Sequence, residues 1–391
     1  MVLKLDYSER VRKLPPYIFA EMEALIAQKV REGVDVIRLG IGDPDVPAPD
    51  VIVDAVVEEV RKPENHKYPT SMGEPDFRQA VARWYEVRFG VELDPDAQVC
   101  NVIGGKEGVA NVARAFVNPG DVVLCPTPGY PVYANGATVF SEGVPYLMPL
   151  EAERDFLPDL EAIPSDVLDR AKLMYLNYPN NPTGAIAPAD FLKEVADLAE
   201  DHQFLVVHDN PYSEFTFGDY VAPSLLEYSP DHVEINSCSK MFNMTGFRVG
   251  WAAGSELAVT GLKKVKSQID SGAPMFIQRA AIRGLALYQG RTKPEVVERT
   301  MRVYEERRDV LVDGLNAIGW ETPKPKATFY VWTRSPEPDS MAFCRKLVDV
   351  GVVITPGVGF GNPHGEGYVR FALTQPVDRI REALERIERV L

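Results

Sequence analysis

The chain has 391 residues, of which 45% are hydrophobic and 25% charged, and its formal net charge is -15. A chain of this length is too long to fold around one small hydrophobic core, so we expect a large domain and a smaller one. The excess of acidic residues argues against a nucleic-acid partner, because its phosphates would be repelled.

The sequence shows no membrane-spanning or metal-binding pattern. There is no run of about 20 apolar residues and no apolar signal core near residue 1, so we expect a cytoplasmic protein without a membrane partner. The cysteines form no CxxC pair and the five histidines have no HExxH spacing, so we expect neither a metal site nor a disulfide framework. The four cysteines are Cys100, Cys125, Cys238 and Cys344.

The N-terminal segment predicts a helix followed by a short strand. Residues 15–32 fit a helix whose apolar face carries Ile18, Met22, Leu25 and Ile26. The stretch VDVIRLGIGDPDVPAP (34–49) predicts a strand that enters a loop rich in glycine and proline. We expect residues 1–45 to join the smaller domain.

A repeated unit begins near residue 98 and predicts the large domain, residues 46–285. Each unit has a short apolar run, a loop rich in Gly, Pro, Asn or Asp, and in several cases a helical stretch such as 188–201. Such alternation is typical of an α/β domain with a mostly parallel, mixed sheet flanked by helices. The runs are QVCNVI (98–103), DVVLC (121–125), KLMYLN (172–177), FLVVHD (204–209) and VEINS (233–237).

Residues 286–391 predict a smaller α/β domain. A long helix is expected over 295–316, and strands over TFYVWTR (328–334) and GYVRFALT (367–374). The last segment, 377–391, predicts an amphipathic helix that carries Ile380, Leu384 and Ile387 on one face.

The residues suited to chemistry follow the five predicted strands of the large domain. In open parallel sheets, ligands bind beyond the carboxyl ends of the strands, so we expect these loops to form one cleft. The first loop opens a helix, whose free N–H groups suit a phosphate. The loops are GGKEG (104–108), PTPGYP (126–131), YPNNPTG (178–184), NPY (210–212) and CSK (238–240).

Lys240 indicates an aldehyde cofactor. A lysine amine forms a Schiff base with an aldehyde, and nearby cations lower its pKa. Arg248 lies eight residues further on, where its guanidinium can bind a phosphate, and Ser237 and Ser239 add hydroxyl donors. The alternative is that Lys240 is an ordinary surface lysine, but that interpretation does not explain the serines and the arginine close to it in the sequence.

The other strand-end residues match the needs of pyridoxal 5'-phosphate. This cofactor needs a carboxylate for its pyridine nitrogen, donors to its ring oxygen, an aromatic face and a phosphate cup. We expect these to be, in order, Asp209; Asn181 and Tyr212; Tyr130; and Gly105, Lys106, Ser237, Ser239 and Arg248.

Four motifs, in order along the chain, resemble the fold-type I pyridoxal-phosphate enzymes, specifically the class I/II aminotransferases. They are YPNNPTG (178–184), HDNPY (208–212), SCSKMFNMTGFRVGW (237–251) and GYVRFALT (367–374), and the resemblance covers nearly the whole chain. It implies a ping-pong transfer of an amino group between an L-amino acid and a 2-oxo acid.

The resemblance also implies roles for single residues. Lys240 is then the Schiff-base lysine, Asp209 the partner of the pyridine nitrogen and Tyr212 a donor to the ring oxygen, and these three form the catalytic set. Arg248 is the phosphate arginine, whereas the substrate is held by Arg370, Gly42 and Asn181. The family forms homodimers with shared active sites, and Tyr68 in KYPTSMG is expected to reach the partner's phosphate.

Three further segments narrow the resemblance. Residues 14–49, 67–85 and 271–278 look like the corresponding parts of LL-diaminopimelate aminotransferases and their close relatives. This implies LL-2,6-diaminopimelate and 2-oxoglutarate as substrates, in lysine biosynthesis. The alternatives are an aminotransferase for aspartate, alanine or aromatic amino acids, a cystathionine β-lyase-like C–S lyase, and a regulator without activity.

Overall fold

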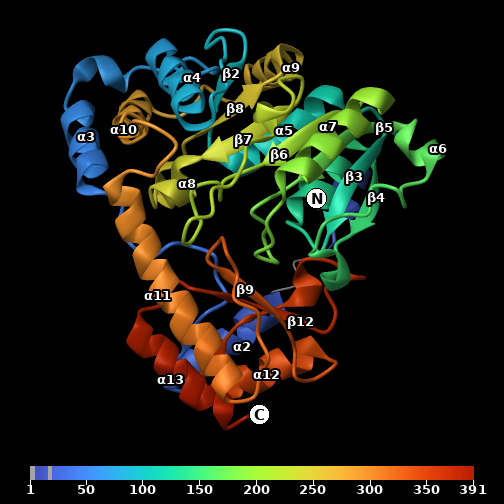
Figure 1. Cartoon of the computed structure of the whole chain (residues 1–391), viewed down its shortest axis with the longest axis vertical. Helices are drawn as coiled ribbons and strands as arrows, with labels where there is room; N and C mark the ends of the chain where they lie inside the picture. Colours follow the sequence, from blue (N-terminus) through green and yellow to red (C-terminus); the bar gives the residue numbers. More distant parts are fainter. Residues whose placement is uncertain (1–4, 16–19) are drawn as a thin grey trace.

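The computed structural model describes residues 5–15 and 20–391, with the backbone alone at 20 and 21. Figure 1 shows two lobes, and the long helix α11 (Glu295–Ala317) runs from one to the other. The upper lobe in this view holds the central sheet, and the lower lobe holds β9 and β12. Ile18, which we predicted on the first helix, lies outside the described residues.

Within the described residues, the central sheet has seven strands in the order β2-β8-β7-β6-β5-β3-β4. β8 runs antiparallel to both of its neighbours, and the other six strands share one direction. The mostly parallel α/β sheet predicted from the sequence is therefore confirmed. The strands are β2 (Val99–Val102), β3 (Val122–Thr127), β4 (Val144–Pro149), β5 (Ala171–Leu176), β6 (Leu205–Asp209), β7 (Val233–Ser237) and β8 (Gly250–Gly254).

Helices cover both faces of this sheet, which explains why its strands are apolar along their whole length. Alternate residues of β5 enter different cores: Leu173 and Tyr175 pack with α5 and α9, whereas Met174 and Leu176 pack with α7. The helices of the upper lobe are α3 (Asp50–Val60), α4 (Pro75–Phe89), α5 (Gly105–Phe116), α6 (Ser165–Leu168), α7 (Ala189–His202), α8 (Cys238–Met241), α9 (Glu256–Lys266) and α10 (Met275–Leu285).

The lower lobe has an antiparallel sheet in the order β11-β12-β9 and a separate parallel pair, β1-β10. The predicted strands and helices of the C-terminal third are confirmed, and Ile380 and Ile387 of the last helix are buried. The elements are α2 (Ala20–Arg31), β1 (Ile37–Arg38), β9 (Tyr330–Arg334), α12 (Ser340–Asp349), β10 (Val352–Val353), β11 (Thr355–Pro356), β12 (Tyr368–Ala372) and α13 (Val377–Glu388).

The N-terminal segment contacts both lobes. Helix α1 (Glu9–Arg12) lies against the short helix η3 (Val139–Ser141), where Arg10 sits 5.9 Å from the centre of the Phe140 ring. Further on, β1 joins the lower lobe through its pairing with β10. The domain boundaries at residues 45 and 285 stay a prediction.

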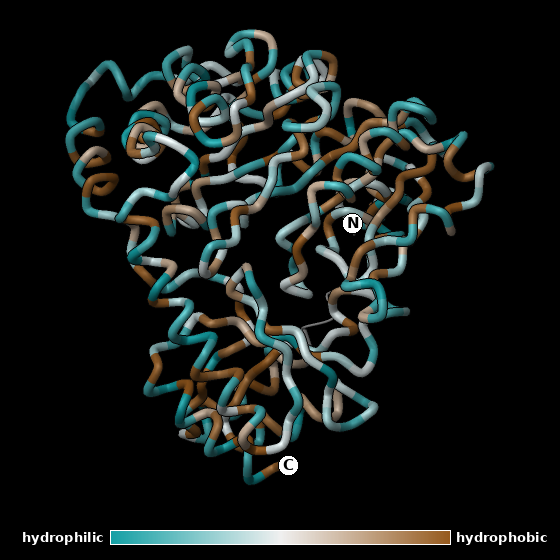
Figure 2. The backbone as a smooth tube through the Cα atoms, viewed as in Figure 1, coloured by the Kyte–Doolittle hydropathy of each residue, from teal (hydrophilic) through white to brown (hydrophobic). Residues whose placement is uncertain are grey.

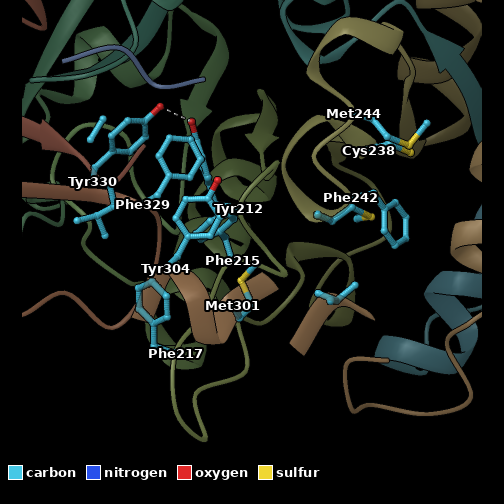
Figure 3. Packing of buried hydrophobic residues seen from close by; sticks show 14 of the residues in the cluster. Tyr212, Phe215, Phe217, Cys238, Phe242, Met244, Met301, Tyr304, Phe329 and Tyr330 are labelled. Atoms are coloured by element: carbon cyan, nitrogen blue, oxygen red, sulfur yellow. Dashed lines mark hydrogen bonds between the residues drawn. The ribbon is translucent and has the colours of Figure 1, made fainter. Parts of the chain in front are cut away.

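Figure 2 shows that hydrophilic residues lie mainly along the outer loops, while hydrophobic residues follow the strands and the inward sides of the helices. Between the lobes, a cluster of aromatic rings joins the loop after β6 to α11 and β9 (Figure 3). The ring centre of Phe215 lies 4.8 Å from that of Tyr304 and 4.9 Å from that of Phe329. This packing fixes the lower lobe next to the carboxyl ends of the central strands. In the described parts of the chain, no helix combines the length and apolarity needed to cross a bilayer.

Candidate active site

A cavity of about 510 Å³ lies at the carboxyl ends of the central strands. Each of the five predicted loops contributes to its lining, so the predicted convergence of strand ends is confirmed. The lining includes eleven residues that we singled out from the sequence: Gly42, Gly105, Lys106, Tyr130, Asn181, Asp209, Tyr212, Ser237, Ser239, Lys240 and Arg248.

Asp209 ends β6 and presents a buried carboxylate to the cavity. The phenol of Tyr133 donates a 2.7 Å hydrogen bond to Oδ2 of Asp209, and the side chain of Asn177 donates to its backbone carbonyl at 2.6 Å. Burial raises the pKa of Asp209 to about 6, while the Tyr133 hydrogen bond and the charge of His208 act in the opposite direction. The carboxylate is thus positioned to accept a proton or a charged hydrogen bond from a ligand.

Lys240 lies on α8, directly after β7. Its Nζ donates a 2.9 Å hydrogen bond to the carbonyl of Gly42 and lies 5.1 Å from the centre of the Phe329 ring. Burial lowers the pKa of Lys240 to about 8, Asp43 raises it, and the two nearby arginines lower it further. About a tenth of this amine is therefore unprotonated at pH 7, far more than for an ordinary lysine, which makes it a better nucleophile.

The start of α5 and the loop around Arg248 form an anion cup. Arg248 donates to the carbonyls of Thr245 at 2.7 Å and of Ile103 at 3.2 Å, so its guanidinium lies beside the N-terminus of α5. Gly104 has a positive φ of 81°, and a Cβ there would collide with that guanidinium. The free N–H groups of the helix, Lys106 and the hydroxyls of Ser237 and Ser239, 2.8 Å apart, complete a site suited to a phosphate.

Arg370, on β12, does not line the cavity itself but contacts two residues that do. It donates to Oδ1 of Asn181 at 2.8 Å and stacks over the Tyr330 ring at 4.2 Å. It also donates to the carbonyl of Gly40 at 2.7 Å, and its Nε has no partner. Among the described residues no carboxylate pairs with this buried guanidinium. A buried cation without a counterion favours an anionic ligand.

Tyr212 and Tyr330 join the two lobes at the cavity wall. Their hydroxyl oxygens lie 3.1 Å apart, as the dashed line in Figure 3 shows. Burial raises the pKa of both phenols, so each keeps its proton near neutral pH. One hydroxyl must donate to the other, so one proton remains free to form a hydrogen bond into the cavity.

Tyr68 is not brought to the site of its own chain. Its side chain is 90% exposed and does not line the cavity. Its predicted role requires a second subunit.

Six lining residues were not predicted: Asp43, Tyr133, Asn177, Pro211, Thr245 and Tyr330. Two carried a usable signal. Asn177 ends the run KLMYLN, as Asp209 ends FLVVHD, and Tyr133 follows Tyr130 by three residues in the loop after β3. Tyr330 had none, because it comes from the strand β9 of the other lobe.

The side chains of the cavity fit pyridoxal 5'-phosphate. An amine of lowered pKa, a buried carboxylate and an anion cup at a helix N-terminus meet in one cavity, as its aldehyde, ring nitrogen and phosphate require. Tyr130, whose ring lies 5.8 Å from Nζ of Lys106, supplies an aromatic face beside the cup. The individual roles stay predictions.

Comparisons with known proteins agree with this geometry. Residues 34–387 match the family model of aminotransferases of class I and II. The LL-diaminopimelate aminotransferase of Moorella thermoacetica is 50% identical over 392 residues, which covers 99% of each chain. That of Aquifex aeolicus is 46% identical over 98% of each chain. Among solved structures, an aspartate aminotransferase of Thermus thermophilus with maleate is 30% identical, with a TM-score of 0.90 over 99% of this chain and 100% of that one.

Proposed function

Because the chain belongs to the aminotransferases of class I and II, which use pyridoxal 5'-phosphate, we propose that it transfers an amino group from LL-2,6-diaminopimelate to 2-oxoglutarate, or in reverse. This reaction belongs to lysine biosynthesis. The substrate assignment is supported by relatives of that name, which match nearly the full chain at 45–50% identity. Both substrates use one cavity in turn, as a ping-pong mechanism requires.

The observation that supports transamination most directly is that Lys240 lines a cavity and Arg370 lies behind its wall, bonded to Asn181. The lysine offers an amine of lowered pKa, and the arginine offers a buried cation without a counterion among the described residues. An α-amino acid carries a reacting amino group next to a carboxylate. These two side chains therefore match its two ends.

Each residue at the cofactor has a separate task. When bound, pyridoxal 5'-phosphate supplies an aldehyde for the amino group and a ring that withdraws electrons from the substrate α-carbon. Asp209 holds the proton on the ring nitrogen, and Tyr212 and Asn181 donate hydrogen bonds to the ring oxygen. The phosphate is bound by the N-terminus of α5 with Gly105, Lys106, Ser237, Ser239 and Arg248.

Arg370 and Lys240 act on the substrate. The guanidinium of Arg370 binds the α-carboxylate through parallel hydrogen bonds, which orients the α-carbon towards Lys240. The backbone at Gly42 forms the wall beside that carbon. Nζ of Lys240 then removes and returns the α-proton as a general base and acid, and its pKa of about 8 suits both steps. Tyr330 of the lower lobe forms part of the cavity wall.

We also propose that the enzyme is a homodimer that shares its active sites, with Tyr68 donated to the partner's phosphate. Two features support this. Tyr68 is exposed, and α3 presents an outward apolar stripe of Val53, Val57 and Val60, each about 40% exposed. Mixing inactive Lys240→Ala with inactive Tyr68→Ala subunits should restore activity, because one site of each heterodimer is intact. No recovery after verified subunit exchange contradicts a shared site.

The substrate proposal is tested by a panel of amino donors. The ratio kcat/KM is measured for LL-diaminopimelate, glutamate, aspartate, alanine and the aromatic amino acids, each with a suitable 2-oxo acid. LL-diaminopimelate should rank first. If aspartate, alanine or an aromatic donor exceeds it by tenfold, about 1.4 kcal/mol in transition-state binding, the substrate is wrong while transamination stands.

One competing function has a specific observation in its favour. The structural likeness to the aspartate aminotransferase of Thermus thermophilus makes aspartate the first rival donor. A C–S lyase would release pyruvate from cystathionine without any added 2-oxo acid, which the same assay detects. We expect the enzyme to act in the cytoplasm, without nucleic-acid or membrane partners, in keeping with its net charge of -15.

A further inference from the structure

A buried histidine and a buried glutamate lie behind Asp209. His208 directly precedes Asp209 on β6 and is paired with Glu234 on β7. Nδ1 of His208 lies 3.2 Å from Oε2 of Glu234, and both side chains are fully buried. Successive residues of a strand point to opposite faces, so this pair occupies the face away from the carboxylate of Asp209.

The hydrogen-bond partner of Nε2 of His208 shows that this ring nitrogen is protonated. Nε2 of His208 lies 3.1 Å from the backbone carbonyl of Tyr178. A carbonyl oxygen only accepts hydrogen bonds, so Nε2 must carry a proton. Nδ1 must carry one too if Glu234 is ionised, since an ionised carboxylate also only accepts.

The surroundings of Glu234 favour the ionised form, and the first donor is Tyr85 of α4. The phenol of Tyr85 lies 2.9 Å from Oε1 of Glu234. The indole of Trp251 donates to the same phenol oxygen at 3.3 Å. Tyr85 is therefore an acceptor towards Trp251, and its own proton is free to point at Glu234.

Two further groups donate hydrogen bonds to Oε2, the other carboxylate oxygen of Glu234. The hydroxyl of Ser224 lies 2.9 Å from Oε2 of Glu234, and the backbone N–H of Leu225 lies 3.3 Å from it. Ser224 itself accepts from the N–H of Leu226, so its proton points to the glutamate. A carboxylate that accepts several hydrogen bonds is held in its charged form. Nδ1 of His208 is then a donor as well, and both ring nitrogens are protonated.

We propose that Glu234 holds His208 as an imidazolium, and that this buried cation keeps the neighbouring Asp209 ionised against the ring nitrogen of the cofactor. The inference rests on the proposed function, because Asp209 faces a ring nitrogen only when pyridoxal phosphate is bound. His208 is a positioning residue: it acts through Asp209, from the opposite face of the sheet.

The electrostatics support this role. His208 and Asp209 are neighbours on β6, and although their side chains leave opposite faces of the sheet, charges in a protein interior are weakly screened. Burial raises the pKa of Asp209 to about 6, and the charge of His208 opposes that rise. The charged group that faces His208 is Glu234 from β7, to which Tyr85 also donates, whereas Asp209 follows on the same strand with its side chain on the other face. A buried ion pair is a weak source of stability, so an effect on Asp209 is the better reason for its presence.

The first test observes the ring protons of His208 directly. Long-range proton–nitrogen NMR spectra of deuterated, cofactor-loaded enzyme with labelled histidine distinguish a ring with two N–H groups from either neutral tautomer. The His208 signal is assigned by its loss in His208→Gln. We expect two N–H groups at neutral pH. A single N–H group overturns the proposal, because the proton would then lie on Glu234.

The second test reads the ring nitrogen of the cofactor. In enzyme loaded with pyridoxal phosphate labelled at that nitrogen, its chemical shift reports protonation. His208→Gln should shift the protonation equilibrium towards the unprotonated ring by about tenfold, which is one pKa unit. The matched control is His232→Gln, a second buried histidine, which lies at the amino end of β7. A His208→Gln signal equal to that of the control overturns the proposal.

A second variant keeps the test available if His208→Gln does not fold. Glu234→Gln preserves the shape of the side chain and removes its charge. It should convert His208 to a neutral tautomer and move the cofactor signal in the same direction as His208→Gln. Two N–H groups on His208 together with an unchanged cofactor signal would overturn the role of Glu234.

The outcomes separate this inference from the proposed function. An enzyme that transaminates normally but shows no change of the ring-nitrogen signal in either variant refutes the role of His208 alone. A protein that fails every donor in the panel loses the proposed function, whereas the two N–H groups of His208 are measured without any substrate.

Discussion

The two walls of the cavity are built in different ways. On the cofactor side, Tyr133 and Asn177 both donate hydrogen bonds to Asp209 within the upper lobe. On the substrate side, the contacts cross between segments: Lys240 bonds to Gly42, Arg370 to Asn181, and Tyr212 to Tyr330. The geometry of the cofactor wall thus does not depend on contacts with the lower lobe. The substrate wall is complete only when the lobes are together.

Lys240 bonds to Gly42 on the substrate side and is also the proposed attachment point of the cofactor. Its loss should therefore have the largest effect. Lys240→Ala removes the covalent link to the cofactor and the base that moves the α-proton, and activity should fall by about 10⁴-fold or more. Borohydride should trap a cofactor label on one peptide of the wild type and on none of this variant. Lys106→Ala is the control and should keep the label. A label on Lys106 or Lys263 contradicts the assignment.

Asp209→Ala should affect the cofactor wall alone. Without its carboxylate the ring nitrogen loses the proton that makes the ring electron-withdrawing, and kcat should fall by about 10³-fold. The variant should still bind the cofactor, because Lys240 and the anion cup are unchanged. Single-turnover rates and visible absorbance measure the two effects separately. Near-normal transamination would remove Asp209 from the catalytic set.

Arg370→Lys should affect the substrate wall alone. A lysine keeps the charge but cannot reproduce the two parallel hydrogen bonds, a loss of about 1.5–3 kcal/mol or roughly 10- to 100-fold in kcat/KM. Every α-amino acid donor should lose a similar factor, since all share the α-carboxylate. Cofactor absorbance should not change. A loss confined to one donor would place Arg370 at the substrate side chain instead.

The attachment of the cofactor should follow the ionisation of Lys240. Because burial lowers the pKa of this amine to about 8, its reactive, unprotonated form accumulates as pH rises through that value. Attachment to cofactor-free enzyme should therefore be about tenfold slower at pH 7 than on the plateau above pH 9. Stopped-flow absorbance gives the profile. Asp43 raises the pKa of Lys240, so Asp43→Asn should move the midpoint to lower pH. A midpoint near 10.5 would show that the amine is not desolvated as the structure indicates.

Tyr212→Phe should have the smallest effect, because it removes a single hydrogen bond between the lobes. Such a bond contributes about 0.5–1.5 kcal/mol, so kcat/KM should fall by roughly two- to tenfold. Tyr330→Phe removes the other partner and is the matched control for the contact between the lobes. If Tyr212→Phe costs more than Tyr330→Phe, the excess measures the hydrogen bond to the cofactor. A loss beyond 100-fold would make Tyr212 essential to the chemistry.

The sequence predicted the residues at the strand ends better than the contacts between the lobes, for a physical reason. Asp209, Asn181 and Lys240 follow apolar runs whose parallel packing brings their ends together, and that pattern is local. Tyr330 meets Tyr212 from 118 residues away, so the contact depends on how the lobes are arranged. Tyr68 is exposed in the single chain, and its predicted role requires a second one.

Two strands of the central sheet escaped prediction because their residues are poor strand formers. β8, GWAAG, contains two glycines and two alanines, which are depleted in strands. β4, VPYLMP, contains two prolines and lies at the edge of the sheet, where a missing N–H is tolerated. Both are held by neighbours on the sheet, not by their own preference.

The pairing of β1 with β10 has a consequence for the order of synthesis. Thr355 bonds to the carbonyl of Gly40, 315 residues earlier, and Arg370 reaches the same carbonyl from 330 residues away. Domains form as they leave the ribosome, so the upper lobe can fold while these N-terminal residues still lack their partners. A nascent chain that ends before β10 holds Lys240, Asp209 and the anion cup, yet it lacks Arg370, the proposed partner of the substrate carboxylate. Under the proposed function, the residues for the cofactor are thus synthesised before the one that binds the substrate.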